Sequence, residues 1–137
     1  MSVRHTLNKT QRLKSRKLIG RLFDKGRSFS FPPFRAYYLL DEDQTHAGES
    51  LLFGTGASSR HFKRAVDRNR IKRLIREAYR LQCGELRLQM KTVPLKLTVF
   101  VLYTGRDMPV YADIAARMDL LLKKLSGVVE QQSGAAS

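Results

Sequence analysis

The sequence has a single cysteine, Cys83, among its 137 residues. One cysteine excludes an intramolecular disulfide and argues against a cysteine-based zinc site, so we expect Cys83 to be a buried, reduced thiol. No apolar run approaches the roughly 20 residues that cross a bilayer, and residues 1–17 lack the apolar stretch of a secretory signal. We therefore expect a cytoplasmic protein that does not insert into membranes.

Groups that carry out catalysis are also scarce. The histidines lie in a basic arm (His5), an acidic loop (His46) and the start of a helix (His61), and none has a serine or cysteine partner in the pattern. The sequence has no HExxH motif, no P-loop and no pair of carboxylates at helical spacing. The acids of residues 41–43 could attract a divalent ion, but they fit a solvated loop better. We predict that the chain supplies no catalytic residue and binds no metal ion tightly.

Acidic residues number only 12 against 26 lysines and arginines, which gives a formal net charge of +14. Hydrophobic residues make up 42%, too many for a disordered polycation, and the length fits one folded domain. The excess charge lies in residues 1–27 and 60–80, which hold nine basic residues each and three acids together, while the rest carries −1. Because clustered like charges repel one another, this pattern predicts a polyanionic partner, nucleic acid rather than a membrane surface.

Hydrophobic periodicity predicts an α+β domain with a sheet of about four strands. We expect a flexible basic arm over 1–14, one folded domain over 15–126 and a disordered tail over 127–137. The predicted elements follow the order α-β-β-β-α-β-α: a helix over 16–25, an edge strand over 28–31, strands over 34–40 and 51–57, a helix from 62 or 66 to 82, a buried strand over 95–103 and a helix over 111–125.

Local signals set the expected ends of these elements. Pro32 and Pro33 confine the first strand to a sheet edge, and residues 41–50 read as a polar hairpin loop. Ser58 and Ser59 offer N-cap side chains before the long helix. Gly84 suits its end.

Basic side chains surround the apolar stripe of the long helix that ends at residue 82. Arg68, Lys72 and Arg76 lie one turn apart in a row, which makes a cationic face about three turns long, roughly 16 Å. Guanidinium groups bind phosphate in a bidentate manner, and Asn69 can hydrogen-bond a base edge or a 2′-OH. This face predicts contact with RNA.

Two other interpretations of the same helix are less consistent with its charges and its apolar stripe. It could be a solvated surface helix in which Glu77 pairs with Arg73 or Arg80, but the two acids of residues 60–80 cannot balance nine cations. It could lie on a membrane, but its apolar stripe is expected to face the core.

The stretch RNRIKRLIREAYR, residues 68–80, together with the preceding KRAV, resembles the signature of the bacterial ribonuclease P protein component. The resemblance runs in register over residues 12–126. It includes RLFDKGRS at 21–28, which resembles the first helix and following turn of that family, and the segments 95–103 and 111–125.

The resemblance implies a fold with the order given above and a left-handed β-α-β crossover that carries the arginine-rich helix. Patterning alone favours a right-handed crossover. The resemblance further implies a division of labour. A large RNA subunit with bound Mg²⁺ hydrolyses precursor tRNA to give the mature 5′ end, and the small protein, one per RNA, binds that RNA and the 5′ leader.

The family pattern also implies roles for individual residues. Residues expected to bind the RNA subunit are Ser59, Arg60, Lys63, Arg64, Arg68, Asn69, Arg70, Lys72, Arg73, Arg76 and Arg80. Residues expected to bind the leader are Ile19, Phe23, Phe34 and Tyr37. Stacking of unpaired bases on aromatic rings is worth about 1–3 kcal/mol each and tolerates any sequence, but these aromatics also fit the inward periodicity of a core. His61 and Lys63 depart from the family pattern, as does Ile19, which stands where many relatives have an aromatic.

Two functions of other classes stay open at this point. One is a general RNA-binding or ribosome-associated protein with no catalytic partner. The other is a nuclease that needs no RNA, which the lack of an acidic metal cluster disfavours.

Overall fold

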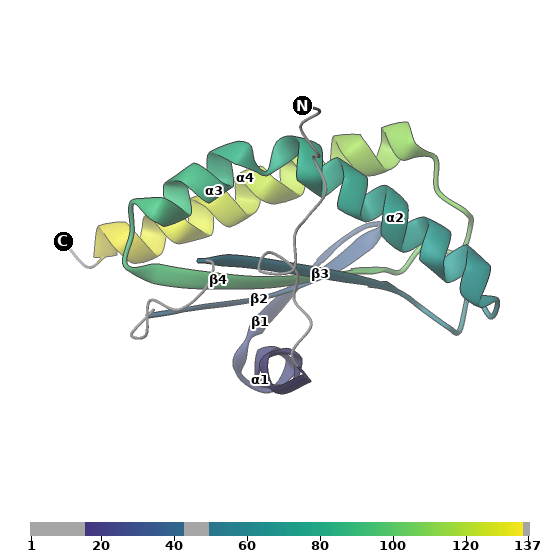
Figure 1. Ribbon diagram of the computed structural model, residues 1–137, viewed down its shortest axis with the longest axis horizontal. Helices are drawn as coiled ribbons and strands as arrows, with labels where there is room; N and C mark the ends of the chain where they lie inside the picture. The colour runs from purple at the N-terminus through teal and green to yellow at the C-terminus, as the bar shows by residue number, and fades with distance from the viewer. Residues whose placement is uncertain (1–15, 43–49, 136–137) are drawn as a thin grey trace, which may run out of the picture.

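The computed structural model describes residues 16–42 and 50–135 and shows one α+β domain with four strands and four helices (Figure 1). The elements are α1 (Arg16–Lys25), β1 (Arg27–Phe31), β2 (Phe34–Glu42), β3 (Leu51–Ala57), α2 (Ala65–Gln82), α3 (Gly84–Lys91), β4 (Leu95–Tyr103) and α4 (Tyr111–Ala135). The fold class and the general order agree with the prediction, and α3 is an addition to it.

The sheet has the strand order β1-β2-β4-β3. β1 and β4 each pair with β2 in antiparallel fashion, and β3 pairs with β4 in parallel. The predicted edge position of β1 and central position of β4 are confirmed. The predicted hairpin between the second and third strands is wrong, because β4 is inserted between β2 and β3. Residues 43–49 of that loop lie outside the described residues, as does the predicted arm over residues 1–14.

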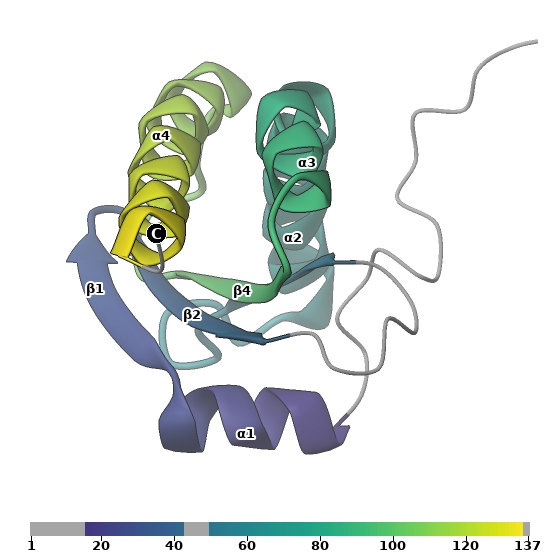
Figure 2. The same ribbon diagram turned by 90° about the vertical axis from the view of Figure 1, so that its left-hand side faces the viewer.

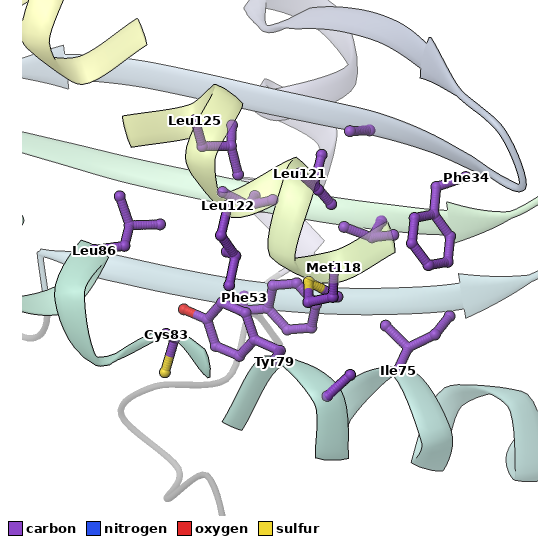
Figure 3. Close-up of a cluster of buried hydrophobic side chains, with 14 of the residues drawn as sticks. Phe34, Phe53, Ile75, Tyr79, Cys83, Leu86, Met118, Leu121, Leu122 and Leu125 are labelled. Atoms are coloured by element: carbon purple, nitrogen blue, oxygen red, sulfur yellow. The ribbon is translucent and has the colours of Figure 1, made fainter. Parts of the chain in front are cut away.

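The sheet separates two unequal layers. α2, α3 and α4 cover one face, and α1 lies on the other (Figures 1 and 2). The main core lies between the sheet and the larger helical layer, where the rings of Phe53 and Tyr79 stack with centroids 3.8 Å apart (Figure 3). Cys83 is buried there as predicted, and desolvation raises the pKa of its thiol. A much smaller cluster around Leu22 and Leu52 joins α1 to the opposite face.

The crossover from β3 to β4 runs through α2 and α3, so the two parallel strands and these helices form a β-α-β unit. Its left hand stays a prediction. α2 begins at Ala65, with Arg64 at the N-cap position and no side-chain cap. The predicted capping role of Ser58 and Ser59 is therefore wrong. The Oγ of Ser58 instead accepts a hydrogen bond from the backbone N–H of Arg60, 3.2 Å away.

The turn at Cys83 does not end the helical layer, because the chain continues as α3. Leu86 and Met90, four residues apart, are both buried and bring α3 down onto the core. α2 ends at Gln82 as predicted, and Gly84 begins α3, with open space around the position that a side chain would occupy there. Burial of Leu86 and Met90 extends the helical layer beyond the predicted helix end.

The expected disordered tail is also wrong for residues 127–135, since α4 extends to Ala135. Val129 is fully buried and continues the apolar stripe of this helix past Leu125. Gln89 of α3 holds the same region: its Nε2 donates to the carbonyl oxygen of Ser126 (3.1 Å), and its Oε1 accepts from the Ser126 hydroxyl (2.7 Å). Among the described residues, no helix is both long and apolar enough to cross a membrane.

Candidate nucleic-acid interface

The apolar stripe of α2 fixes which way its cations point. Ile71, Ile75 and Ala78 are fully buried against the sheet and α4. Arg70 and Arg73, on the other side of the helix, are exposed. The helix therefore presents cations to the surface mainly through Arg70 and Arg73, whereas Arg68, Lys72 and Arg76 of the predicted row are half-buried.

The side chain of Arg68 points back toward the backbone that precedes α2. Its Nη1 donates to the carbonyl oxygens of Phe62 (2.8 Å) and Lys63 (2.7 Å), in the segment that leads from β3 into α2. Phe62 is buried and its ring lies 6.0 Å from that of Tyr103. The Phe62 ring and the Arg68 guanidinium together fix the start of α2 in the absence of a side-chain cap.

The two acids of residues 60–80 each pair with one cation. Asp67 accepts from Arg64, with an Nε–Oδ2 distance of 3.2 Å. Glu77 forms a two-pronged pair with Arg80, one of the two partners foreseen for it, and its Oε2 lies 3.1 Å from Nε of that arginine. The charges of Arg64 and Arg80, both predicted RNA ligands, are thus partly compensated.

The other predicted RNA ligands have different surroundings. Within residues 16–42 and 50–135, no carboxylate pairs with Arg60, Lys63, Arg70, Lys72 or Arg73. Ser59, Arg60, Lys63 and Asn69 are exposed, and Lys72 and Arg76 are half-buried. This part of α2 and its leading segment carry uncompensated positive charge, which favours binding of a polyanion.

An aromatic cluster lies on the opposite face of the sheet, beside α1. The ring of Phe23, 49% exposed, meets Tyr37 edge-on with centroids 4.7 Å apart and Phe100 with centroids 5.6 Å apart. The guanidinium carbon of Arg35 lies 5.8 Å from the Tyr37 centroid. We refer to Phe23, Tyr37 and Phe100 as the aromatic cluster.

Two predictions about this face need correction. Phe34 was expected to bind the leader, but it is fully buried in the main core, because alternation along β2 places Phe34 with the large helical layer and Tyr37 with α1. Phe100 was overlooked because β4 read as buried on both sides. In the structure Val99 and Val101 are buried while Phe100 and Leu102 are half-buried, an alternation that the unbroken apolar run of the sequence does not show.

α1 positions Phe23 through few contacts. Leu22 is buried against Leu52, and Arg21 Nη2 lies 2.7 Å from Oδ2 of Asp41, which ends up in β2 and not in the predicted loop. Gly26 directly follows α1 and lies close against the backbone of β2, so that a Cβ there would lie 2.8 Å from the carbonyl oxygen of Tyr38. Ile19 is partly buried beside Leu22, so it contributes apolar surface and no ring.

No group of three or more histidine, cysteine, aspartate or glutamate side chains that could hold a metal ion occurs among the described residues.

Comparisons with known proteins agree with one another. The family model described as Ribonuclease P matches residues 7–126. The Ribonuclease P protein component of Porphyromonas gingivalis is 32% identical over 123 residues, 90% of this chain and 88% of that protein. That of Desulfovibrio desulfuricans is 32% identical over 124 residues, with the same shares covered. The solved RNase P protein of Staphylococcus aureus has a TM-score of 0.61 at 22% identity and covers 84% of this chain and 94% of its own.

Proposed function

The chain belongs to the ribonuclease P protein family, and from this premise we propose that it is the subunit that binds the ribonuclease P RNA and the 5′ leader of precursor tRNA. Its membership implies a subunit of an endoribonuclease with an RNA partner. The observation that carries the finer proposal is the cationic face of α2, where Arg70, Lys72 and Arg73 have no carboxylate partner within the described part of the chain.

In this proposal the α2 face binds the RNA subunit. Arg70 and Arg73 present guanidinium groups that match phosphate oxygens in a bidentate manner, and Asn69 offers an amide to a base edge or a 2′-OH. Arg68 contributes by holding the start of the helix. The complex contains one protein per RNA and works in the cytoplasm.

The aromatic cluster binds the leader. Unpaired bases stack on exposed rings without regard to their identity, which suits a leader that differs from one tRNA to the next. Phe23 is half exposed, and Tyr37 and Phe100 lie beside it, so the cluster offers ring surface to solvent, and Ile19 extends its apolar wall.

We assign the hydrolysis to the RNA subunit and its Mg²⁺ ions, and no catalytic or metal-binding residue to the protein. The protein's part is to neutralise phosphates and to hold the substrate, both of which lower the Mg²⁺ concentration that the RNA needs.

Reconstitution tests this function. The full chain is mixed with a bacterial ribonuclease P RNA, and cleavage of precursor tRNA is followed at low Mg²⁺ against reactions with RNA alone and with protein alone. We expect cleavage at the mature 5′ end to be faster with both components than with RNA alone, and none with protein alone. No stimulation at any salt concentration that permits binding would overturn the proposal. Equal affinity for duplex DNA, unrelated RNA and ribonuclease P RNA would favour a general RNA-binding protein.

A further inference from the structure

A second row of cations and rings runs along the edge of the molecule, between β1 and α4. The Arg117 guanidinium carbon lies 6.0 Å from the centroid of the Phe31 ring, and Lys124 Nζ lies 4.3 Å from that of Phe29. The two cations are seven residues apart, two turns of the helix, and the two rings are two residues apart on the same side of the strand. The two elements therefore run alongside each other with cations and rings in register.

One further step along each element leads to a pocket of about 270 Å³. Arg27 is two residues before Phe29 on β1, and Gln131 is seven residues after Lys124 on α4, and both line the pocket. Lys25, Tyr38, Leu39, Leu40, Val128 and Gln132 complete its lining. The pocket exists because α4 continues past residue 126. We call the row Arg117, Phe31, Lys124, Phe29 and this pocket the β1–α4 surface.

The surface carries four cations, Lys25, Arg27, Arg117 and Lys124, all exposed. None of the four forms an ion pair with a carboxylate in the described part of the chain. Leu120, 48% exposed, lies on α4 between the two cations that touch rings. Acidic Asp119 on the same helix pairs with Lys123 (3.1 Å), and both line a different pocket, on the side toward α3.

The β1–α4 surface lies away from the α2 face, and its rings lie away from the aromatic cluster, although its pocket reaches Lys25 of α1 and Leu39 beside that cluster. Phe29 and Phe31 pack against the main core, on the opposite face of the sheet from the aromatic cluster. Figure 2 shows α4 and β1 on one side of the molecule and α2 and α3 on the other. A ligand on this surface therefore does not compete for space with one on the exposed side of α2.

We propose that the β1–α4 surface is a second binding site for the phosphodiester backbone of RNA, so that the protein contacts two RNA segments from opposite sides. The proposal rests on the proposed function. Cations interleaved with aromatic rings are the pattern by which proteins bind RNA without sequence preference, because the cations neutralise phosphates and the rings accept bases. A purely acidic protein partner would make use of the cations but not of the rings.

A charge-removing variant tests the site through its effect on the salt dependence of binding. The double variant Arg117→Gln, Lys124→Gln is compared with Lys123→Gln, which removes a cation from the same helix on its other side. The logarithm of the association constant for ribonuclease P RNA is plotted against the logarithm of KCl concentration. Two lost phosphate contacts should reduce the slope of the double variant by about 1.4–1.8, and the control should keep the wild-type slope.

A charge-preserving swap, Arg117→Lys with Lys124→Arg, separates phosphate binding from packing. The swap should keep the wild-type slope even where its melting temperature falls. Slopes that are equal for the double variant and the control would overturn the proposal and leave the row as protection of an edge strand. If the double variant lost binding to polyglutamate but kept the wild-type slope with RNA, the proposal would be overturned in favour of an acidic protein partner. Stimulation of cleavage by the wild-type chain is measured in parallel, so failure of the proposed function is recognised separately.

Discussion

Arg68 and Arg70 lie two positions apart on α2 and have different surroundings. The family resemblance implies that both bind the RNA subunit, but neither a motif nor helical spacing identifies the neighbours of each cation. In the structure the Arg68 guanidinium bonds to two backbone carbonyl oxygens, and Arg70 is exposed. The segment with which Arg68 bonds includes a buried phenylalanine, Phe62, whose burial no local pattern revealed.

The two arginines should therefore respond differently to truncation. Arg68→Ala should lower the free energy of unfolding by about 1–3 kcal/mol, because it removes charged hydrogen bonds that are partly buried. It should weaken RNA binding without changing the slope of affinity against salt. Arg70→Ala should leave stability within about 0.5 kcal/mol and reduce that slope by about 1. Chemical denaturation measures the stability of each variant, and salt titration measures the slope of its RNA affinity. A reduced slope for Arg68→Ala would show that Arg68 contacts phosphate directly.

Phe34 and Phe23 form a second contrast at this scale. Both were predicted to bind the leader, and only Phe23 is exposed. Phe34→Ala should lower the free energy of unfolding by about 3–5 kcal/mol, as for other large cavities. Phe23→Ala should cost about 1–2 kcal/mol, since half of its ring already contacts water. Urea denaturation of the two variants checks this, and similar losses would mean that the sheet faces are assigned wrongly.

Among the secondary-structure elements, those with an uninterrupted pattern were predicted well. The bounds of α1, β3 and β4 agree with the sequence-based ranges. The errors lie where contacts between residues far apart in the chain overrode a local sequence signal. No local pattern predicted α3 after the end of α2, where Leu86 and Met90 are buried, or the continuation of α4 past residue 126, where Val129 is buried. The false hairpin has the same origin, because insertion of β4 between β2 and β3 depends on contacts far apart in the chain.

The extension of α4 past residue 126 can be tested by its effect on stability. Val129 is fully buried and Val128 is only half-buried. Val129→Ala should lower the free energy of unfolding by about 2 kcal/mol, and Val128→Ala by less than about 1 kcal/mol. The gain in helix propensity is the same in both variants, so their difference reports burial alone. Thermal or urea unfolding measures the two changes in stability. If both substitutions left stability unchanged, the result would favour the disordered tail that the sequence predicts.

For the molecule as a whole, the sheet divides the proposed functions. The cations of α2 lie on one face and the aromatic cluster on the other, with β3 leading toward α2. On the face that carries the aromatic cluster, the Phe100 ring lies close to the backbone of β3 at Gly56, where an added Cβ would lie 3.1 Å from Cζ of Phe100. Helical spacing predicted that α2 carries a row of cations, but the cations most exposed are Arg70 and Arg73 and not the predicted row. It could not predict the full aromatic cluster, because that depends on which face of each strand α1 covers.

We propose that the α2 face binds the RNA subunit and the aromatic cluster binds the leader. The most direct measurement determines two dissociation constants for Arg70→Ala and for Phe23→Ala: that of the protein for ribonuclease P RNA, and that of the assembled complex for precursor tRNA with and without a leader. We predict that Arg70→Ala weakens assembly and keeps leader discrimination in the complex formed. Phe23→Ala should assemble normally and lose about fivefold or more in affinity, only for the substrate with a leader. The same defect in both variants would contradict the claim.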